Sequence, residues 1–407
     1  MERLRPISAD SQESESDRQG AEGDGKRNCR PVRHRLAEVD KRRLQEKVPT
    51  GSTAGLPATD ADERWNKMKA LGVGIVGTGW VSGEHIKAFQ ANPHTEVRGI
   101  VSRDPARATA WAKEQGLAHC QAYDQLASML EDPAIKIVSI CTPHHLHASQ
   151  AIAAAKAGKH LMLEKPVALD LAGLRELQAA VRSSKVKTVV SFVLRWNPLF
   201  EIVKTLIADG VVGQLFYGEV DYLHGIGPWY AQYKWNIKKS IGGSSLLTAG
   251  CHAVDGLRWF VGQRVVEVFS YANCSHRNPL AYEYEPNSVT LIKFEDGTVG
   301  KVASSVECVM PYVFNIKLLG DGGTIRNNQV FSKRWSGQKD WATIPTILPD
   351  SGDVTHHPFK LQVNDFVDCI LGDRESIAGL DDASHTHEIC YAAEMSIRER
   401  RPVSLPL

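Results

Sequence analysis

The 407-residue sequence lacks the features that mark membrane, secreted, metal-binding and nucleic-acid-binding proteins. No apolar run is long enough to span a bilayer, and the N-terminus has no apolar core of the kind that a secretory signal needs. The eight cysteines form no CxxC pair, which argues against a zinc site and against a disulfide framework. The formal net charge is +1, so no overall field attracts nucleic acid or an anionic membrane. We therefore expect a cytoplasmic protein with reduced thiols and with no metal, nucleic-acid or membrane partner.

Residues 1–67 also lack a buriable apolar pattern. The stretch from Ser8 to Arg43 is crowded with charged and polar residues, and Pro49–Pro57 has the composition of a linker. Such a segment cannot bury enough apolar surface to offset its chain entropy, so we expect residues 1–67 to be a disordered N-terminal extension. Met68, directly before the first strand candidate, is then a candidate translation start.

Between residues 68 and 192, short apolar segments alternate with helical patterns. The main strand candidates are Leu71–Val76, Glu96–Ser102, Ile135–Cys141, His160–Leu163 and Val186–Phe192. Apolar strands separated by helices imply right-handed crossovers and a parallel sheet. We expect a Rossmann NAD(P)-binding domain over residues 68–192.

After residue 192 the strand candidates become longer, and Gly-containing turns such as Asp296-Gly297 separate several of them. These strands are Leu215–His224, Val265–Ala272, Ser288–Phe294, Thr298–Val306 and Val313–Leu319. The accompanying helices are Leu246–Phe260, Lys360–Ile370 and Thr386–Arg398. The expected fold class is therefore α/β, with a substrate-binding α/β domain over residues 193–407 that contains a large open, mainly antiparallel sheet.

A glycine-rich turn, Gly77-Thr78-Gly79-Trp80-Val81-Ser82, joins the first strand to the first helix. Gly77 permits the tight turn, Gly79 lets the backbone approach a pyrophosphate, and Ser82 is small enough for close helix–strand packing. Amide groups at the helix N-terminus then face the phosphates. The position of this motif between a strand and a helix indicates a dinucleotide site.

The second strand ends at Ser102-Arg103-Asp104, the position at which a Rossmann domain contacts the adenosine ribose of its cofactor. A hydroxyl and a guanidinium can accept the 2′-phosphate of NADP, whereas Asp104 keeps NAD as the alternative. We expect NADP or NAD, with Ser102 and Arg103 favouring NADP.

The fifth strand runs into Glu164-Lys165-Pro166. Ligands of open α/β sheets bind beyond the carboxyl ends of the strands, so Lys165 stands where nicotinamide and substrate meet. We interpret Lys165 as a fixed donor to a substrate hydroxyl.

With these motifs, the sequence resembles the glucose–fructose oxidoreductase / inositol dehydrogenase (Gfo/Idh/MocA) family over roughly residues 70–400. The resemblance rests, in order, on Gly74–Gly79, Cys141-Thr142-Pro143, Ala157–His160, Glu164-Lys165-Pro166, Arg195–Pro198, Gly242-Gly243-Ser244 and Gly250–Asp255. It implies a Rossmann domain followed by a sheet domain that covers the nicotinamide. It also implies reversible oxidation of a carbinol on a sugar, polyol or related ring, with Lys165 and His252 as the catalytic pair.

The residues around His252 support this role. Thr248, His252 and Asp255 are spaced four and three apart, so they share one face of a helix, and a histidine accepts a hydroxyl proton near neutral pH. Many family members carry an acidic residue where this sequence has Thr248, which leaves substrate choice and the proton route open. His144, His145 and His147 precede or begin a helix that lines the cofactor cleft in the family, and we assign no metal to them.

The expected site therefore combines a catalytic pair with cofactor and substrate contacts. The cofactor-binding residues are Gly77, Thr78, Gly79, Trp80, Val81, Ser102, Arg103, Thr142, Pro143, His147, Glu164 and Lys165. The substrate-binding residues are Arg195, Thr248 and Asp255.

The function that follows is an NAD(P)-dependent dehydrogenase acting on a secondary alcohol of a carbohydrate, assembled as a homo-oligomer. Two alternatives stay open: a glycosidase or epimerase that oxidises the ring transiently and retains its NAD, and a non-catalytic cofactor-binding regulator.

Overall fold

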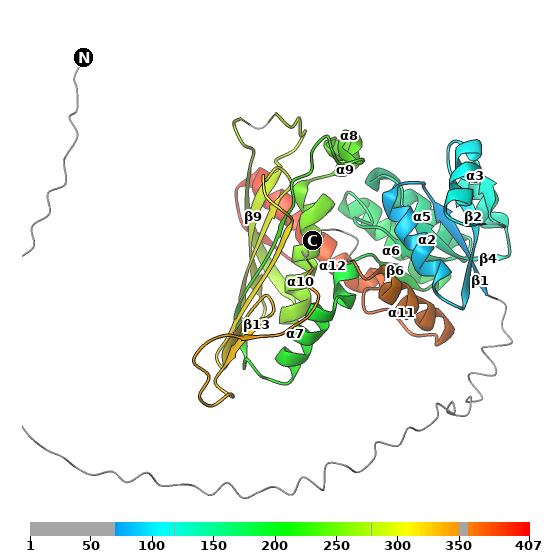
Figure 1. The fold of residues 1–407 in the computed structure, drawn as a ribbon. Coiled ribbons are helices and arrows are strands. Elements are labelled where there is room, and N and C mark those ends of the chain that lie inside the picture. The colour runs from blue at the N-terminus through cyan, green and yellow to red at the C-terminus, as the bar shows by residue number, and fades with distance from the viewer. Residues whose placement is uncertain (1–69, 118, 278, 350–356) are drawn as a thin grey trace, which may run out of the picture. The chain divides into compact units, whose positions relative to one another are not determined.

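The computed structural model describes residues 70–117, 119–277, 279–349 and 357–407 (Figure 1). Residues Lys67–Leu407 form one compact unit. The extension expected over residues 1–67 and the candidate start at Met68 lie outside the described residues. Within the described ranges, no helix is both long and apolar enough to cross a bilayer.

The first sheet has six parallel strands in the order β3-β2-β1-β4-β5-β6, which is the strand order of a Rossmann fold. The strands are β1 Leu71–Val76, β2 Thr95–Val101, β3 Gln121–Tyr123, β4 Ile135–Ile140, β5 His160–Leu163 and β6 Thr188–Val190. The chain order reverses between β1 and β4, and ligands bind beyond the strand ends at such a point.

Helices cover both faces of this sheet, because its strands are apolar on both sides. The helices of this part are α2 Trp80–Gln90, α3 Pro105–Glu114, α4 Leu126–Glu131, the short 3₁₀ segment His144–Leu146, α5 His147–Lys156 and α6 Leu171–Ser184. Buried residues of α2 and α3 pack on one face of the sheet, and those of α4, α5 and α6 pack on the other.

Among the described residues, the second sheet has nine strands in the order β14-β13-β12-β11-β7-β10-β9-β8-β15. Its pairs are antiparallel except for β10 with β7. The strands are β7 Leu215–Leu223, β8 Val265–Asn273, β9 Asn287–Phe294, β10 Val299–Ser305, β11 Val313–Gly320, β12 Gly323–Arg326, β13 Gln329–Ser332, β14 Ala342–Thr343 and β15 Val403–Ser404. This confirms the expected open, mainly antiparallel sheet.

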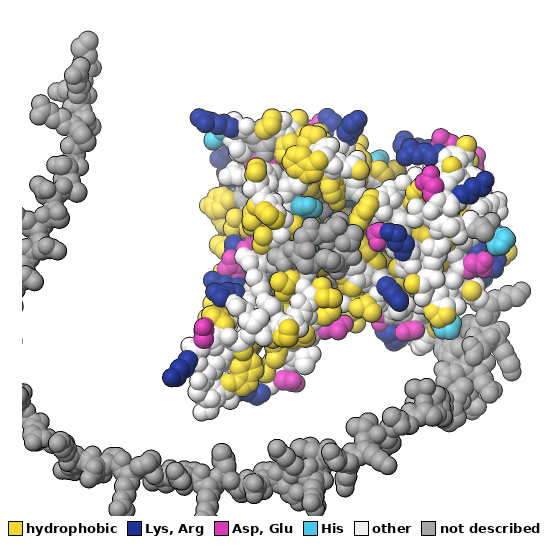
Figure 2. Space-filling view, in the orientation of Figure 1, with side chains coloured by type: hydrophobic (Ala, Val, Ile, Leu, Met, Phe, Trp, Pro, Cys, Tyr) yellow, Lys and Arg dark blue, Asp and Glu magenta, His cyan; other side chains and the backbone are white. Residues whose placement is uncertain are grey.

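One face of the nine-stranded sheet is covered by helices that stand between it and the Rossmann sheet (Figure 1). The helical elements of this part are the 3₁₀ segment Val193–Trp196, α7 Pro198–Ala208, α8 Tyr233–Asn236, α9 Lys239–Gly242, the π-helix Leu246–Gly250, α10 Cys251–Val261, α11 Phe359–Leu371 and α12 Leu380–Glu399. A single hydrophobic core runs from α5 and α6 through α12 and α10 to the inner side of this sheet. Figure 2 shows that side chains of both charge signs are interspersed over the visible surface, in agreement with the small net charge.

Helix α11 belongs to the Rossmann core although it lies far along the chain. Its residues Val363 and Phe366 are fully buried in the same cluster as Ile86 and Phe89 of α2. Asn92 Nδ2, just after α2, donates to Asn364 Oδ1 at 2.8 Å. The expected division after residue 192 therefore does not separate two self-contained cores.

Candidate active site

A cavity of about 740 Å³ lies at the carboxyl ends of the Rossmann strands. Its wall includes Val76, Val101, Cys141 and Glu164, which end or directly follow β1, β2, β4 and β5. The nine-stranded part contributes further lining residues, among them Tyr222 of β7. The cavity is therefore placed where the two parts meet, as the strand-end rule requires.

The glycine-rich turn opens this cavity at the start of α2. Gly77 has φ of 104°, and a Cβ at this position would lie 2.8 Å from the carbonyl oxygen of Cys141. Only glycine fits this close approach without strain. At Gly79 a Cβ would meet no atom of the described residues within 4 Å, so the backbone beside the helix start borders open space. The N-cap residue of α2 is Gly79, which has no side chain to cap the first turn, so the amide groups there are available for an anion.

The far end of the cavity carries Ser102, Arg103, Asp104 and Arg107. Asp104 Oδ1 accepts a hydrogen bond from the backbone amide of Arg107 at 3.0 Å, so this carboxylate caps α3. Arg103 and Arg107 are exposed and face the cavity, so two guanidinium groups are available for the adenosine half of a dinucleotide.

Glu164, which directly follows β5, is a buried carboxylate that lines the cavity. Its Oε1 lies 3.1 Å from Nε2 of His85, which is fully buried on α2. Burial alone would raise the pKa of Glu164, but the hydrogen bond and charge of His85, with a contribution from Lys165, lower it overall. Glu164 is therefore ionised at neutral pH.

Lys165 points away from Glu164, toward the second part of the molecule. Its Nζ donates to the backbone carbonyl of Thr248 at 2.8 Å. Thr248 lies in the π-helical turn Leu246–Gly250 that leads directly into α10. A π turn alters the local carbonyl pattern and occurs frequently at functional sites. Through this turn, Lys165, which follows β5, contacts the segment that leads into the helix of His252.

His252 is the second residue of α10 and is 4% exposed. Its ring stacks on Tyr222 at 5.8 Å between centroids and meets the rings of Phe192 and His357 edge-on. Burial, together with the charges of Lys165 and His357, holds the pKa of His252 well below its ordinary value. The imidazole is therefore neutral near pH 7, as a general base must be.

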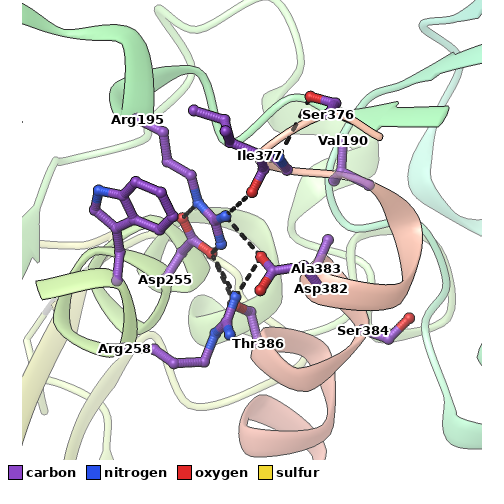
Figure 3. A network of polar contacts seen from close by, with 12 residues as sticks. Val190, Arg195, Asp255, Arg258, Ser376, Ile377, Asp382, Ala383, Ser384 and Thr386 are labelled. Atoms are coloured by element: carbon purple, nitrogen blue, oxygen red, sulfur yellow. Dashed lines mark hydrogen bonds and ion pairs between the residues drawn. The ribbon is translucent and has the colours of Figure 1, made fainter. Parts of the chain in front are cut away.

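The structure corrects the expected role of Arg195 and Asp255. Neither is among the described residues that line the cavity. Arg195 is 1% exposed, and its Nε and Nη2 donate to the two carboxylate oxygens of Asp255 at 2.8 and 2.5 Å. Figure 3 shows the same guanidinium meeting Ile377 and Asp382, with Arg258 and Thr386 completing the network. These residues join α10 to α12 behind the site.

The Thr248 side chain also differs from its predicted role. Its hydroxyl donates to the carbonyl of Gly242 at 3.1 Å and accepts from Asn236 Nδ2 at 3.3 Å, and Thr248 is not among the described cavity-lining residues. The carbonyl of this residue, rather than its hydroxyl, serves the site by holding Lys165.

The other sequence-predicted residues are brought together around the cavity. They are Gly77, Thr78, Gly79, Trp80, Val81, Ser102, Arg103, Thr142, Pro143, His147, Glu164, Lys165 and His252. The ring nitrogens of His147 lie 2.6 and 2.7 Å from the carbonyl oxygens of Thr142 and Pro166, so this histidine braces the wall rather than pointing into the cavity.

Several lining residues carry no role in the sequence prediction, including Gln150, Ser191, Tyr222, Gln232 and Phe359. They stand on five separate stretches of chain without a shared motif, so no local signal marks them. Tyr230 and Trp235, which follow β7 in the chain, also line the cavity. The residues that the structure describes include no group of three or more His, Cys, Asp or Glu side chains suited to a metal.

The residues present fit a nicotinamide dinucleotide. The open space at Gly79 and the uncapped start of α2 suit a pyrophosphate. Among the described residues, the buried Oγ of Ser191 and Nδ1 of His252 have no hydrogen-bond partner, and both residues line the cavity. Buried polar atoms are normally paired, so these two indicate room for a polar ligand.

Comparison with known proteins gives matches for both parts of the chain. Residues 71–192 match the family described as "Oxidoreductase family, NAD-binding Rossmann fold". Residues 200–326 match the family described as "GFO/IDH/MocA C-terminal domain".

Individual relatives agree with these matches. An uncharacterized oxidoreductase of Synechocystis sp. is 30% identical over 274 residues, which are 66% of this chain and 71% of that protein. The scyllo-inositol 2-dehydrogenase (NAD(+)) of Bacillus subtilis is 27% identical over 339 residues, or 81% of this chain and 95% of that protein. The solved structure of a levoglucosan dehydrogenase in complex with NADH and levoglucosan has a TM-score of 0.75 at 24% identity, covering 83% of this chain and 100% of that one.

Proposed function

This chain belongs to the Gfo/Idh/MocA family of oxidoreductases, and we propose that it transfers hydride between a nicotinamide dinucleotide and a secondary alcohol of a sugar, polyol or related ring. The observation that carries the proposal is the meeting of Lys165 and His252 in the cavity that the glycine-rich turn opens. A nicotinamide bound there would exchange hydride with the carbinol carbon of the substrate.

The two side chains divide the work on the substrate oxygen. His252, neutral because its pKa is low, accepts the hydroxyl proton in the oxidative direction. Lys165 donates a hydrogen bond to the same oxygen and stabilises the negative charge that develops on it. The Thr248 carbonyl fixes the ammonium group before substrate arrives, so little reorganisation is needed.

The remaining wall suits a polyhydroxylated ring. Tyr222, Tyr230 and Trp235 provide apolar aromatic surface, and Gln232 provides amide donors and acceptors. A ring with C–H groups on its faces and hydroxyls at its edge matches this combination. The similarity to an inositol dehydrogenase over 81% of this chain supports a cyclic polyol or sugar as the substrate class.

We also propose a cytoplasmic homo-oligomer. The outer face of the nine-stranded sheet exposes Tyr271, Val289, Leu291 and Val299 on neighbouring strands, and neighbouring exposed apolar side chains of this kind are typical of protein–protein contact surfaces. Light scattering on the purified protein measures the assembly, and a monomer at micromolar concentration would contradict this part of the proposal.

The experiment that tests the function is single-turnover reduction of bound cofactor by a panel of neutral sugars and cyclitols, including scyllo-inositol and levoglucosan. Both NAD⁺ and NADP⁺ are used, and each active substrate is repeated with deuterium at the reacting carbon. We expect reduction that deuterium slows. A protein that binds cofactor but reduces it with no member of the panel would contradict the proposal. Reduction followed by reoxidation within one turnover would favour the transient-oxidation alternative.

A further inference from the structure

Glu164 and its neighbour Lys165 directly follow β5 and carry opposite charges. Their side chains point to different parts of the molecule. Lys165 Nζ binds the carbonyl of Thr248, on the side of the second part of the molecule. The Glu164 carboxylate points toward α2, where it forms a hydrogen bond with His85. The negative charge therefore lies in the cavity wall on the side of α2, and the positive charge lies on the side of His252.

His85 fixes this carboxylate from behind. An ionised carboxylate only accepts hydrogen bonds, so Nε2 of His85 carries a proton and donates to Glu164 Oε1 at 3.1 Å. The other ring nitrogen, Nδ1, lies 2.8 Å from Ser139 Oγ, and the ring packs against Phe359 at 5.2 Å between centroids. His85 is fully buried and is not among the described cavity-lining residues, whereas Glu164 is. The carboxylate thus separates His85 from the cavity.

We propose that the Glu164 carboxylate, held by His85, makes the site prefer the oxidised, cationic nicotinamide over the reduced, neutral one. The inference rests on the proposed function, because it requires a nicotinamide dinucleotide in the cavity. The two redox forms share their adenosine and pyrophosphate groups and differ by one positive charge on the ring. A fixed negative charge in a buried site therefore acts on the difference between them, and its effect is larger there than in water.

The direction of the effect does not depend on the protonation state of His85. Burial lowers the pKa of His85, but Cys141 and Glu164 raise it to about 10. With a protonated ring, the pair is a dipole whose negative end faces the cavity. With a neutral ring, the pair carries a full negative charge. In both cases, replacing Glu164 by glutamine makes the potential in the cavity more positive.

The test measures binding rather than turnover. Dissociation constants for NAD⁺, NADH and ADP-ribose are measured by calorimetric titration for the wild type, Glu164→Gln and Glu84→Gln. If the wild type prefers the phosphorylated cofactors, NADP⁺, NADPH and 2′-phospho-ADP-ribose replace them. Glutamine keeps the size of Glu164 and an oxygen for His85, and ADP-ribose lacks the nicotinamide. Glu84 is the matched control, because it is a carboxylate on the same helix as His85 and is not among the described residues that line the cavity of about 740 Å³.

We expect Glu164→Gln to weaken the oxidised cofactor about tenfold, which corresponds to about 1.4 kcal/mol. The reduced cofactor and ADP-ribose should change by less than about twofold on the same scale, and Glu84→Gln should leave the oxidised-to-reduced ratio unchanged. An unchanged ratio in Glu164→Gln, or equal losses for both redox forms, would overturn the inference while leaving the proposed function intact. A wild-type protein that binds ADP-ribose but neither redox form would instead overturn the proposed function and the inference with it.

Discussion

Lys165 and Thr248 lie 83 positions apart in the chain, yet the lysine Nζ donates to the threonine carbonyl at 2.8 Å. This contact joins the segment that directly follows β5 to the π-helical turn before His252. The ammonium group is therefore oriented by backbone of the second part of the molecule. Lysine position and histidine position are linked through one turn of chain.

The first prediction concerns Lys165. Lys165→Met keeps an unbranched side chain but removes the donor, so the developing charge on the substrate oxygen loses its stabilisation. We expect the single-turnover rate of cofactor reduction to fall by about 10²–10³-fold, with the affinity for ADP-ribose within about twofold of wild type. Lys136→Met, on an exposed residue of β4, is the matched control and should react normally. A Lys165→Met protein with wild-type rates would remove Lys165 from the mechanism.

The second prediction concerns the pH dependence that His252 imposes. A base works in its deprotonated form, and the pKa of His252 is lowered well below its ordinary value of about 6.5. Protonation of His252 should therefore not slow the reaction between about pH 6.5 and 8, and its effect should begin only at more acidic pH. His252→Ala should lose about 10²–10⁴-fold, with a residual rate that rises with pH as hydroxide replaces the base. If the wild-type rate instead fell with decreasing pH around pH 7, a group other than His252 would be the acceptor of the hydroxyl proton.

The third prediction concerns the stability of the buried network around Arg195. Arg195→Ala leaves the buried carboxylate of Asp255 without its bidentate partner, and breaking such a pair costs about 3–5 kcal/mol in unfolding free energy. Urea denaturation measures the loss. The control is Arg182→Ala, which removes an exposed pair with Asp381 and should cost at most about 1 kcal/mol.

The same network gives a pH-dependent stability. Burial raises the pKa of Asp382, but Arg195 and Arg258 lower it overall. A carboxylate with a lowered folded-state pKa stabilises the protein above its unfolded pKa of about 3.9 and loses this contribution as the pH falls through the folded value. The stability difference between wild type and Asp382→Asn should therefore shrink below about pH 4. A difference that stays constant into the acid range would contradict this assignment.

The fourth prediction concerns cofactor choice. If Arg103 binds a 2′-phosphate, Arg103→Ala should weaken NADP⁺ by about 1.5–3 kcal/mol and spare NAD⁺. Arg107→Ala tests the second guanidinium at this end of the cavity in the same titration. Equal losses for both cofactors would show that Arg103 stacks on the adenine and does not read the phosphate.

The fifth prediction concerns the N-terminal region. Lys67–Leu407 form one compact unit, so a protein that begins at Met68 should retain the melting temperature and cofactor affinity of the full chain. Thermal unfolding and titration of both proteins provide the comparison. Loss of soluble protein in the shorter chain would show that the first 67 residues are needed for folding.

The parts of the fold that sequence reasoning recovers are those with local signals. The bounds of β1 and β5 agree with the prediction to the residue, because each is an apolar run with a clear start and end. The single predicted helix Leu246–Phe260 is instead a π-helical turn followed by α10. Strands β12 to β15 have two to four residues each, which is too short for a periodic pattern to emerge.

In the candidate site, too, some residues have a local sequence signal and others do not. Glycine spacing and strand ends mark the cofactor side, and motifs mark Lys165 and His252. Arg195 and Asp255 have the polar character of ligand-binding residues. In the folded protein, however, these two residues, which are 60 positions apart in the chain, bind each other in the interior. Whether a motif arginine meets a substrate or a buried carboxylate depends on packing between distant segments, which no local pattern encodes.

Helix α11 has a consequence for how such a protein can be recombined. Its side chains complete the packing of α2, and Gln362 Nε2 also donates to the carbonyl of Val190 in β6. A chimera that exchanges residues 68–192 with a relative would pair a foreign α2 with the original α11. The packing of α2 is retained only when residues 359–371 travel with the N-terminal segment, so the unit that can be swapped includes at least two pieces of chain rather than one.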